Sequence, residues 1–147
     1  MVNKSLRIVG IVLLVLGIII ALYIVRERKV ILEAMRDGAA AGLLEQKLLA
    51  TASDIRKQLP IRVDEITSLS SVLAQGTTLT YSYRMDIPIP NRAIFEASQR
   101  RTLIGTECGL RGDRGLLKQG GKFGFIYIDV TGAIVGEIII NERDCAQ

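Results

Sequence analysis

The sequence predicts an α+β domain that is held to a membrane by one N-terminal helix. The first observation is an uncharged run of eighteen residues, 8–25, flanked by Arg7 and Arg26. The second is the order of patterns beyond residue 42: helical spacing, two strand-like segments, helical spacing again, and two further strand-like segments. This order predicts a four-stranded antiparallel sheet with helices packed on one face, arranged α-β-β-α-β-β.

The uncharged run has the length of a membrane span. At about 1.5 Å per residue it crosses most of a hydrocarbon core of roughly 30 Å, where only a helix satisfies the backbone. We therefore expect a short tail over residues 1–7 and a transmembrane helix over 8–25. A cleaved signal peptide is the rival interpretation, but its apolar core is usually shorter and no cleavage site follows closely.

Two further features concern the span. Gly17 and Ala21 have the small-xxx-small spacing that allows two membrane helices to approach, so a homodimer is compatible with the sequence. Incidental small residues facing lipid are the competing interpretation. The positive charges on the two sides of the span indicate its orientation only weakly. They give almost no preference, or they favour a cytoplasmic location for the C-terminal side.

The cysteine count favours the opposite orientation. Cys108 and Cys145 are the only cysteines in 147 residues. An even pair in a small domain beyond an anchor predicts a disulfide in an oxidising compartment. Two unrelated thiols in a cytoplasmic domain are the alternative. We favour the bridge because it would hold a chain terminus that otherwise tends to fray.

The composition argues against common catalytic sites. There is no histidine, which removes Ser-His-Asp and Cys-His activation and the commonest metal ligand. Paired carboxylates remain, at Asp64-Glu65 and at Glu142 with Asp144, but neighbouring arginines favour solvated ion pairs for them. We expect no enzyme activity, no metal and no cofactor.

Helical spacing covers the region between the anchor and the first strand. Residues 26–42 are predicted to be a helical juxtamembrane linker, and residues 43–147 the soluble domain. Leu43, Leu44, Leu48, Leu49 and Ile55 give the first domain helix an apolar stripe, and the proline at position 60 ends it.

Strands and a second helix follow. Val63 to Leu73 is predicted as a strand, and Thr77 to Asp86 alternates as a half-buried strand does. Asn91 is the expected N-cap of a helix from Arg92 to about Glu107. We expect this helix to face the core with four apolar positions: Ala93, Ile94, Ala97 and Ile104.

The chain ends in a predicted hairpin behind a loop that covers residues 109–121. Phe123, Phe125 and Tyr127 alternate within its first strand, residues 129–132 form its turn, and residues 133–141 return. Both faces of this hairpin are apolar, which predicts a position at the centre of the sheet.

The sheet face opposite the helices is the predicted contact surface. A covered apolar face leaves the alternating polar side chains of residues 78–84 open, and a loop rich in Arg and Lys follows the second helix. The alternative is a solvated loop that binds no partner. Nucleic-acid binding is not expected, because aromatic residues are not interleaved with these charges. The candidate partner contacts are Thr80, Ser82, Arg84, Arg111, Arg114, Lys118 and Lys122.

The element order and the Cys108/Cys145 pair resemble small bacterial envelope domains of the secretion-pilotin type. The resemblance covers roughly residues 49–145. It implies a twisted antiparallel sheet with flanking helices, a periplasmic location and a protein partner. Pilotins of that kind are lipoproteins, whereas this chain has no cysteine soon after the apolar run.

Together these observations predict a non-enzymatic, single-pass protein of the bacterial inner membrane. Its domain would face the periplasm and bind another protein, as an assembly factor, an accessory subunit or an inhibitor/immunity protein. The alternative is a cytoplasm-facing membrane adaptor or regulator with free thiols.

Overall fold

The computed structural model describes residues 35–109 and 114–146. The chain divides into two compact units, 1–39 and 40–147. Within the described residues no helix is long and apolar enough to cross a bilayer. The predicted span, residues 8–25, with its Gly17 and Ala21, lies outside the described residues.

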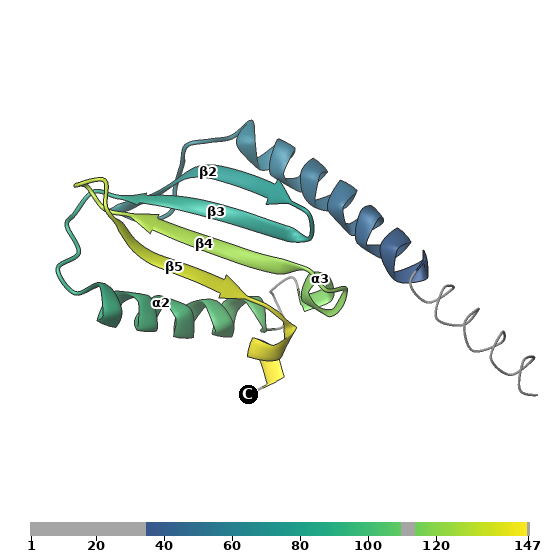
Figure 1. Ribbon diagram of the computed structural model, residues 1–147. Helices are drawn as coiled ribbons and strands as arrows, with labels where there is room; N and C mark the ends of the chain where they lie inside the picture. Colours follow the sequence, from purple (N-terminus) through teal and green to yellow (C-terminus); the bar gives the residue numbers. More distant parts are fainter. Residues whose placement is uncertain (1–34, 110–113, 147) are drawn as a thin grey trace, which may run out of the picture. The chain divides into compact units, whose positions relative to one another are not determined.

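The second unit is an α+β domain with a five-stranded mixed sheet (Figure 1). Its strands are adjacent in sequence order, β1-β2-β3-β4-β5, and only the β3–β4 pair is parallel. The strands are β1 (Ile61–Arg62), β2 (Thr67–Gln75), β3 (Thr78–Met85), β4 (Lys122–Ile128) and β5 (Ile134–Ile140).

The predicted four-stranded antiparallel sheet is therefore wrong in two respects. The segment predicted as one strand, Val63 to Leu73, is a strand only from Thr67 onward, as part of β2, and the extra strand β1 precedes it at Ile61–Arg62. The two hairpins join side by side in parallel, because the connection between them contains the helices α2 (Arg92–Glu107) and α3 (Arg114–Lys118). A connection of this length can return the chain to the opposite end of the sheet, which parallel pairing requires.

The hydrophobic core lies on one face of the sheet. A helix that covers residues 40–56 in this unit, here called the N-terminal helix, supplies three buried residues, Leu44, Leu48 and Ala52. Their spacing of four residues places them on one helical stripe. The strands and α3 supply the rest: Leu69, Val72, Ala74, Leu79, Met85, Leu116, Leu117, Phe123, Phe125, Tyr127, Val135, Ile138 and Ile140.

Helix α2 runs along β5 and faces the core with a side that only partly matches the prediction (Figure 1). The Asn91 N-cap is confirmed, since its side-chain oxygen accepts a hydrogen bond from the Ile94 amide at 3.1 Å. No residue of α2 is fully buried, and Ile94 is 68% exposed. Of the four predicted positions only Ile104 packs against the core, together with Phe95 and Leu103, which were not predicted.

The last hairpin also differs from expectation. Strand β4 lies inside the sheet, but β5 is an edge strand, so the predicted central position holds only for β4. The predicted turn is confirmed: the Asp129 carboxylate accepts hydrogen bonds from the Thr131 amide and hydroxyl, and Gly132 has φ +84°. The Thr131 hydroxyl lowers the pKa of Asp129. A 3₁₀ helix, η1 (Glu142–Ala146), follows β5.

Candidate functional site

The middle strand β3 separates two surfaces of different chemistry. Tyr81 and Tyr83 pack against the core. Because side chains alternate along a strand, Thr80, Ser82 and Arg84 face the other way. We define the open face as the side chains of β2–β5 that point away from the core: Ser68, Ser71, Leu73, Gln75, Thr78, Thr80, Ser82, Arg84, Lys122, Ile126, Ile128, Ile134, Glu137 and Ile139.

Strand register brings the predicted residues of β3 and β4 together. Thr78 pairs with Lys122, and Thr80 pairs with Gly124. A Cβ built on Gly124 would lie 2.8 Å from the Thr80 hydroxyl oxygen, so the Thr80 side chain occupies the space above that glycine. Gly124 thus allows Thr80 to lie flat across β4, and a larger residue there would displace it.

The open face also carries apolar residues that sequence reasoning did not assign to it. Leu73, Ile134 and Ile139 are about half exposed, at 54%, 52% and 49%. Leu73 pairs with Thr80 and Ile139 pairs with Gly124, so these two lie in one row across the sheet, whereas Ile134 lies in another row beside Ile128. The sequence did show that both faces of the last hairpin are apolar. That pattern was interpreted as burial at the centre of the sheet and not as an exposed apolar surface.

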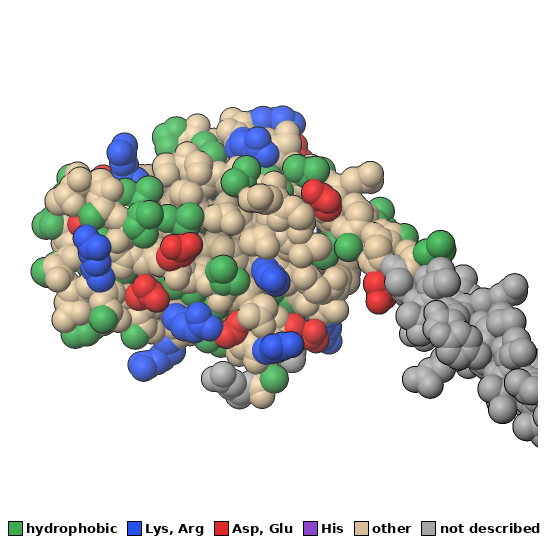
Figure 2. Space-filling model, viewed as in Figure 1, with side chains coloured by type: hydrophobic (Ala, Val, Ile, Leu, Met, Phe, Trp, Pro, Cys, Tyr) green, Lys and Arg blue, Asp and Glu red, His purple; other side chains and the backbone are tan. Residues whose placement is uncertain are grey.

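Opposite charges lie in the next two rows of the open face. Arg84 pairs with Ile128 on β4, and Glu137 pairs with Ile126. Both charged residues are exposed. Figure 2 shows that acidic, basic and hydrophobic side chains are interspersed on the visible surface, without a large area of one charge sign. The open face therefore suits a partner that brings apolar contacts with polar groups around them.

The predicted basic loop is only partly brought to the open face. Lys122 begins β4 beside Thr78, whereas Lys118 ends α3. Helix α3 is anchored by two buried leucines at positions 116 and 117. Arg114 begins α3, and Arg111 lies outside the described residues.

Lys122 also borders a hollow of about 360 Å³ between the start of β4 and η1. Glu142 and Arg143 line its other side. Sequence reasoning missed Arg143 as a neighbour of Lys122, because the two are 21 positions apart and meet only when β5 returns beside β4.

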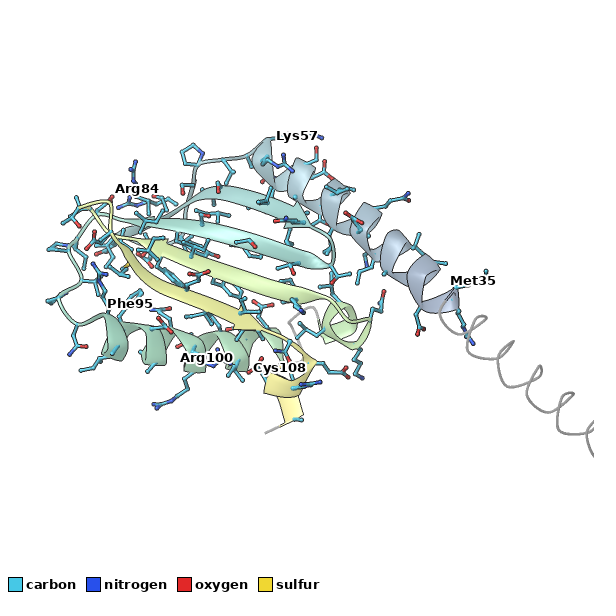
Figure 3. All side chains as sticks on the ribbon, in the orientation of Figure 1. Met35, Lys57, Arg84, Phe95, Arg100 and Cys108 are labelled. Carbon is cyan, nitrogen blue, oxygen red and sulfur yellow. A yellow bond between two sulfur atoms is a disulfide. The ribbon has the colours of Figure 1, made fainter. Side chains whose placement is uncertain are left out.

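The end of α2 is attached to the end of the chain. Cys108 and Cys145 are bonded in the structure, with Cα atoms 5.2 Å apart, inside the usual range for disulfides. An Arg100 guanidinium nitrogen lies 2.5 Å from an Asp144 carboxylate oxygen, and Arg100 also donates to the Ile139 carbonyl. Asp144 therefore forms the ion pair predicted for it. Figure 3 labels Arg100 and Cys108 on α2.

The described residues contain no group of three or more His, Cys, Asp or Glu side chains that could hold a metal ion. The acidic pair 64–65 lies in the turn after β1. Asp64 accepts a hydrogen bond from the Ile66 amide, which lowers the pKa of this carboxyl group and keeps it ionised at neutral pH.

No family model and no curated protein matches this chain. Three solved structures share its fold. A Pseudomonas aeruginosa protein thought to be secreted is 17% identical with a TM-score of 0.61, covering 72% of this chain and 96% of that one. EpsS, the pilotin of the Vibrio vulnificus type 2 secretion system, is 12% identical with a TM-score of 0.60, covering 74% and 96%.

The third is AspS, the type II secretion system pilotin of Vibrio cholerae. It is 14% identical with a TM-score of 0.57, and the match covers 74% of this chain and 97% of that one. The resemblance to pilotin-type envelope domains is therefore confirmed at the level of the fold.

Proposed function

We propose that this chain is a single-pass protein of the bacterial inner membrane whose α+β domain faces the periplasm and binds another protein without catalysing a reaction. Its role is that of an assembly factor, in line with its fold likeness to two secretion pilotins. Residues 8–25 are the anchor, in place of a lipid. The Cys108–Cys145 bond supports a location in an oxidising compartment.

The open face is the observation that carries the protein-binding part of this proposal. Exposed Leu73, Ile134 and Ile139 leave an apolar surface that binding would remove from water. Arg84 and Lys122 would add contacts to acidic groups of the partner, and Thr80 and Ser82 would add hydrogen bonds. Arg111, Arg114 and Lys118 extend the proposed contact surface along the loop before β4.

Capture of a partner from mild detergent tests this surface with a matched pair of variants. Ile139→Arg adds a charge to the open face, and Ile94→Arg adds the same charge to an exposed position on α2. We expect Ile139→Arg to lose the partner that the unaltered chain captures, and Ile94→Arg to retain it. Equal capture by both folded variants would move the binding surface elsewhere.

The loop is tested separately by charge reversal at Arg111 and Arg114. We expect weaker capture by the folded variant, because reversal of two positive charges would repel an acidic partner surface. Orientation is tested by quantifying reactive thiols in intact cells. A blocked cysteine pair supports the periplasmic side, whereas two free thiols would support a cytoplasm-facing adaptor.

Helix–helix contact through Gly17 and Ala21 is proposed on sequence alone.

A further inference from the structure

A cavity of about 190 Å³ lies between α2 and the core face of the sheet, away from the open face. Tyr83 and Tyr127 contribute from the strands, and Phe95, Gln99 and Leu103 contribute from α2. The turn after β1 closes another side of the cavity, with Val63 and Asp64. This cavity is large enough for one amino-acid side chain or a small ligand.

Three aromatic rings form much of its wall. The Tyr83 and Tyr127 rings stack, with centroids 5.1 Å apart and planes at 16°. Phe95 meets Tyr127 edge to face, with centroids 5.2 Å apart and planes at 83°. Figure 3 shows Phe95 on the side of α2 near the strands. Aromatic rings carry negative charge density on their faces, and so they attract cations.

The polar groups of the cavity add to this preference. Asp64 supplies an ionised carboxylate, and the Gln99 side-chain oxygen, 3.5 Å from the Tyr127 hydroxyl, supplies an acceptor. Burial raises the pKa of Tyr83, and the charge of Glu107 adds to this rise, so a second carboxylate acts on this ring. Among the described residues that line the cavity, none is basic, and Arg62, whose charge acts on Asp64 from outside the lining, is paired with Asp86.

We infer that this cavity binds a primary alkylammonium group, the chemistry of a lysine side chain or of a small amine. The alkyl chain would lie against the rings, and the ammonium group would donate hydrogen bonds to the Asp64 carboxylate and the Gln99 oxygen. Neutral ligands of the same size would lack the attraction to the carboxylates. This site goes beyond the proposed function and does not depend on it.

The test uses the full chain in a maltoside detergent, which carries no ammonium group, with ¹³C-labelled tyrosine. Titration with n-butylammonium is expected to shift the Tyr83 and Tyr127 ring signals saturably. The isosteric neutral ligand 1-butanol is expected to bind about tenfold or more weakly, since a desolvated cation–π contact and a charge-assisted hydrogen bond together exceed the free energy of one decade. Equal affinities for the two ligands, or no saturable shift, would overturn the inference.

Two variants locate the charge that the ligand needs. Asp64→Asn removes the carboxylate at the cavity, whereas Asp54→Asn removes one on the exposed surface of the N-terminal helix. We expect Asp64→Asn to weaken n-butylammonium binding at least about threefold and to leave 1-butanol unchanged, with Asp54→Asn affecting neither. Unaltered Tyr81 signals serve as the folding check. Retained affinity in folded Asp64→Asn would contradict the proposed site.

A third ligand distinguishes the two sources of the ammonium group. Nα-acetyl-lysine-N-methylamide presents the same chain attached to a peptide backbone. Binding of this compound together with n-butylammonium supports recognition of a lysine side chain. Binding of n-butylammonium alone supports a free amine. Binding of neither compound refutes the site.

Discussion

The two long helices of the domain are attached to the same sheet in different ways. The N-terminal helix buries Leu44, Leu48 and Ala52 almost completely. Helix α2 buries no residue completely and is attached by three partly buried side chains, Phe95, Leu103 and Ile104, and by the Cys108–Cys145 bond. The first helix is therefore held by apolar burial, and the second by a few specific links.

This difference has a physical consequence. Burial of whole side chains contributes about 1.5–3 kcal/mol each, so removal of the N-terminal helix would expose much of the core. An attachment with few buried contacts opens locally at lower free energy than the rest of the fold. We therefore expect α2 to open before the N-terminal helix, and the proposed ammonium cavity lies beneath the helix that opens first.

The largest expected effect comes from the core of the N-terminal helix. Leu48→Ala should lower the free energy of unfolding by about 3 kcal/mol, because it leaves a cavity at a fully buried position. Leu43→Ala, at a position that is 71% exposed, is the matched control and should change it by less than about 0.5 kcal/mol. Denaturant unfolding of the full chain in detergent, followed by tyrosine circular dichroism, measures both. Similar losses would contradict the assignment of the core stripe.

Loss of the disulfide should have the next effect. Cys145→Ser is expected to lower the free energy of unfolding by about 2–4 kcal/mol, since it frees both α2 and the chain end. Amide hydrogen exchange should accelerate in α2 more than in β3. Equal stability of the unaltered chain with and without reductant would count against a bridge in the native protein.

The ring contact of α2 should contribute less. Phe95→Ala is expected to lower the free energy of unfolding by about 1–2 kcal/mol, because Phe95 is only half buried and loses one edge-to-face contact. Ile94→Ala on the outer side of the same helix is the control, with a change below about 0.5 kcal/mol. A larger loss at Ile94 would mean that the helix faces the core as the sequence pattern suggested.

The smallest effect is expected for the ion pair. Arg100→Ala should cost less than about 1 kcal/mol, because the Arg100 side chain is 45% exposed and solvent screens the pair. The loss should shrink as salt is added. Arg101→Ala, at an exposed neighbouring position on α2, is the control and should have no measurable effect. A salt-independent loss at Arg100 would show that packing, not charge, holds α2 there.

Residue patterns were informative where one local rule applied. Asn91 caps α2, Gly132 closes the last turn with a positive φ, and the strand from residue 78 alternates between core and open face as predicted. The predicted stripe of α2 was right at Ile104 but wrong at Ala93, Ile94 and Ala97, which are apolar yet exposed. Phe95 and Leu103 have a spacing of eight, which is also helical, so composition alone could not choose between the two sides.

The candidate site depended on strand order, which no local pattern encodes. Thr80, Ser82 and Arg84 could be assigned to one face from their alternation, but their neighbours on β4 follow from the parallel pairing across α2 and α3. An apolar residue in a strand looks the same to sequence reasoning whether it enters the core or lies on an exposed surface. Ile139 and Ile138 are adjacent and chemically identical, yet one is half exposed and the other buried.

Length, charge and alternation thus decided which segments form helices, strands and turns, because those preferences act within a few residues of the chain. The folded domain alone decided which strands meet, which side of α2 faces inward and which apolar residues stay exposed. Contacts between residues far apart in sequence determine these features, and their free energies depend on the burial and register that the complete sheet imposes.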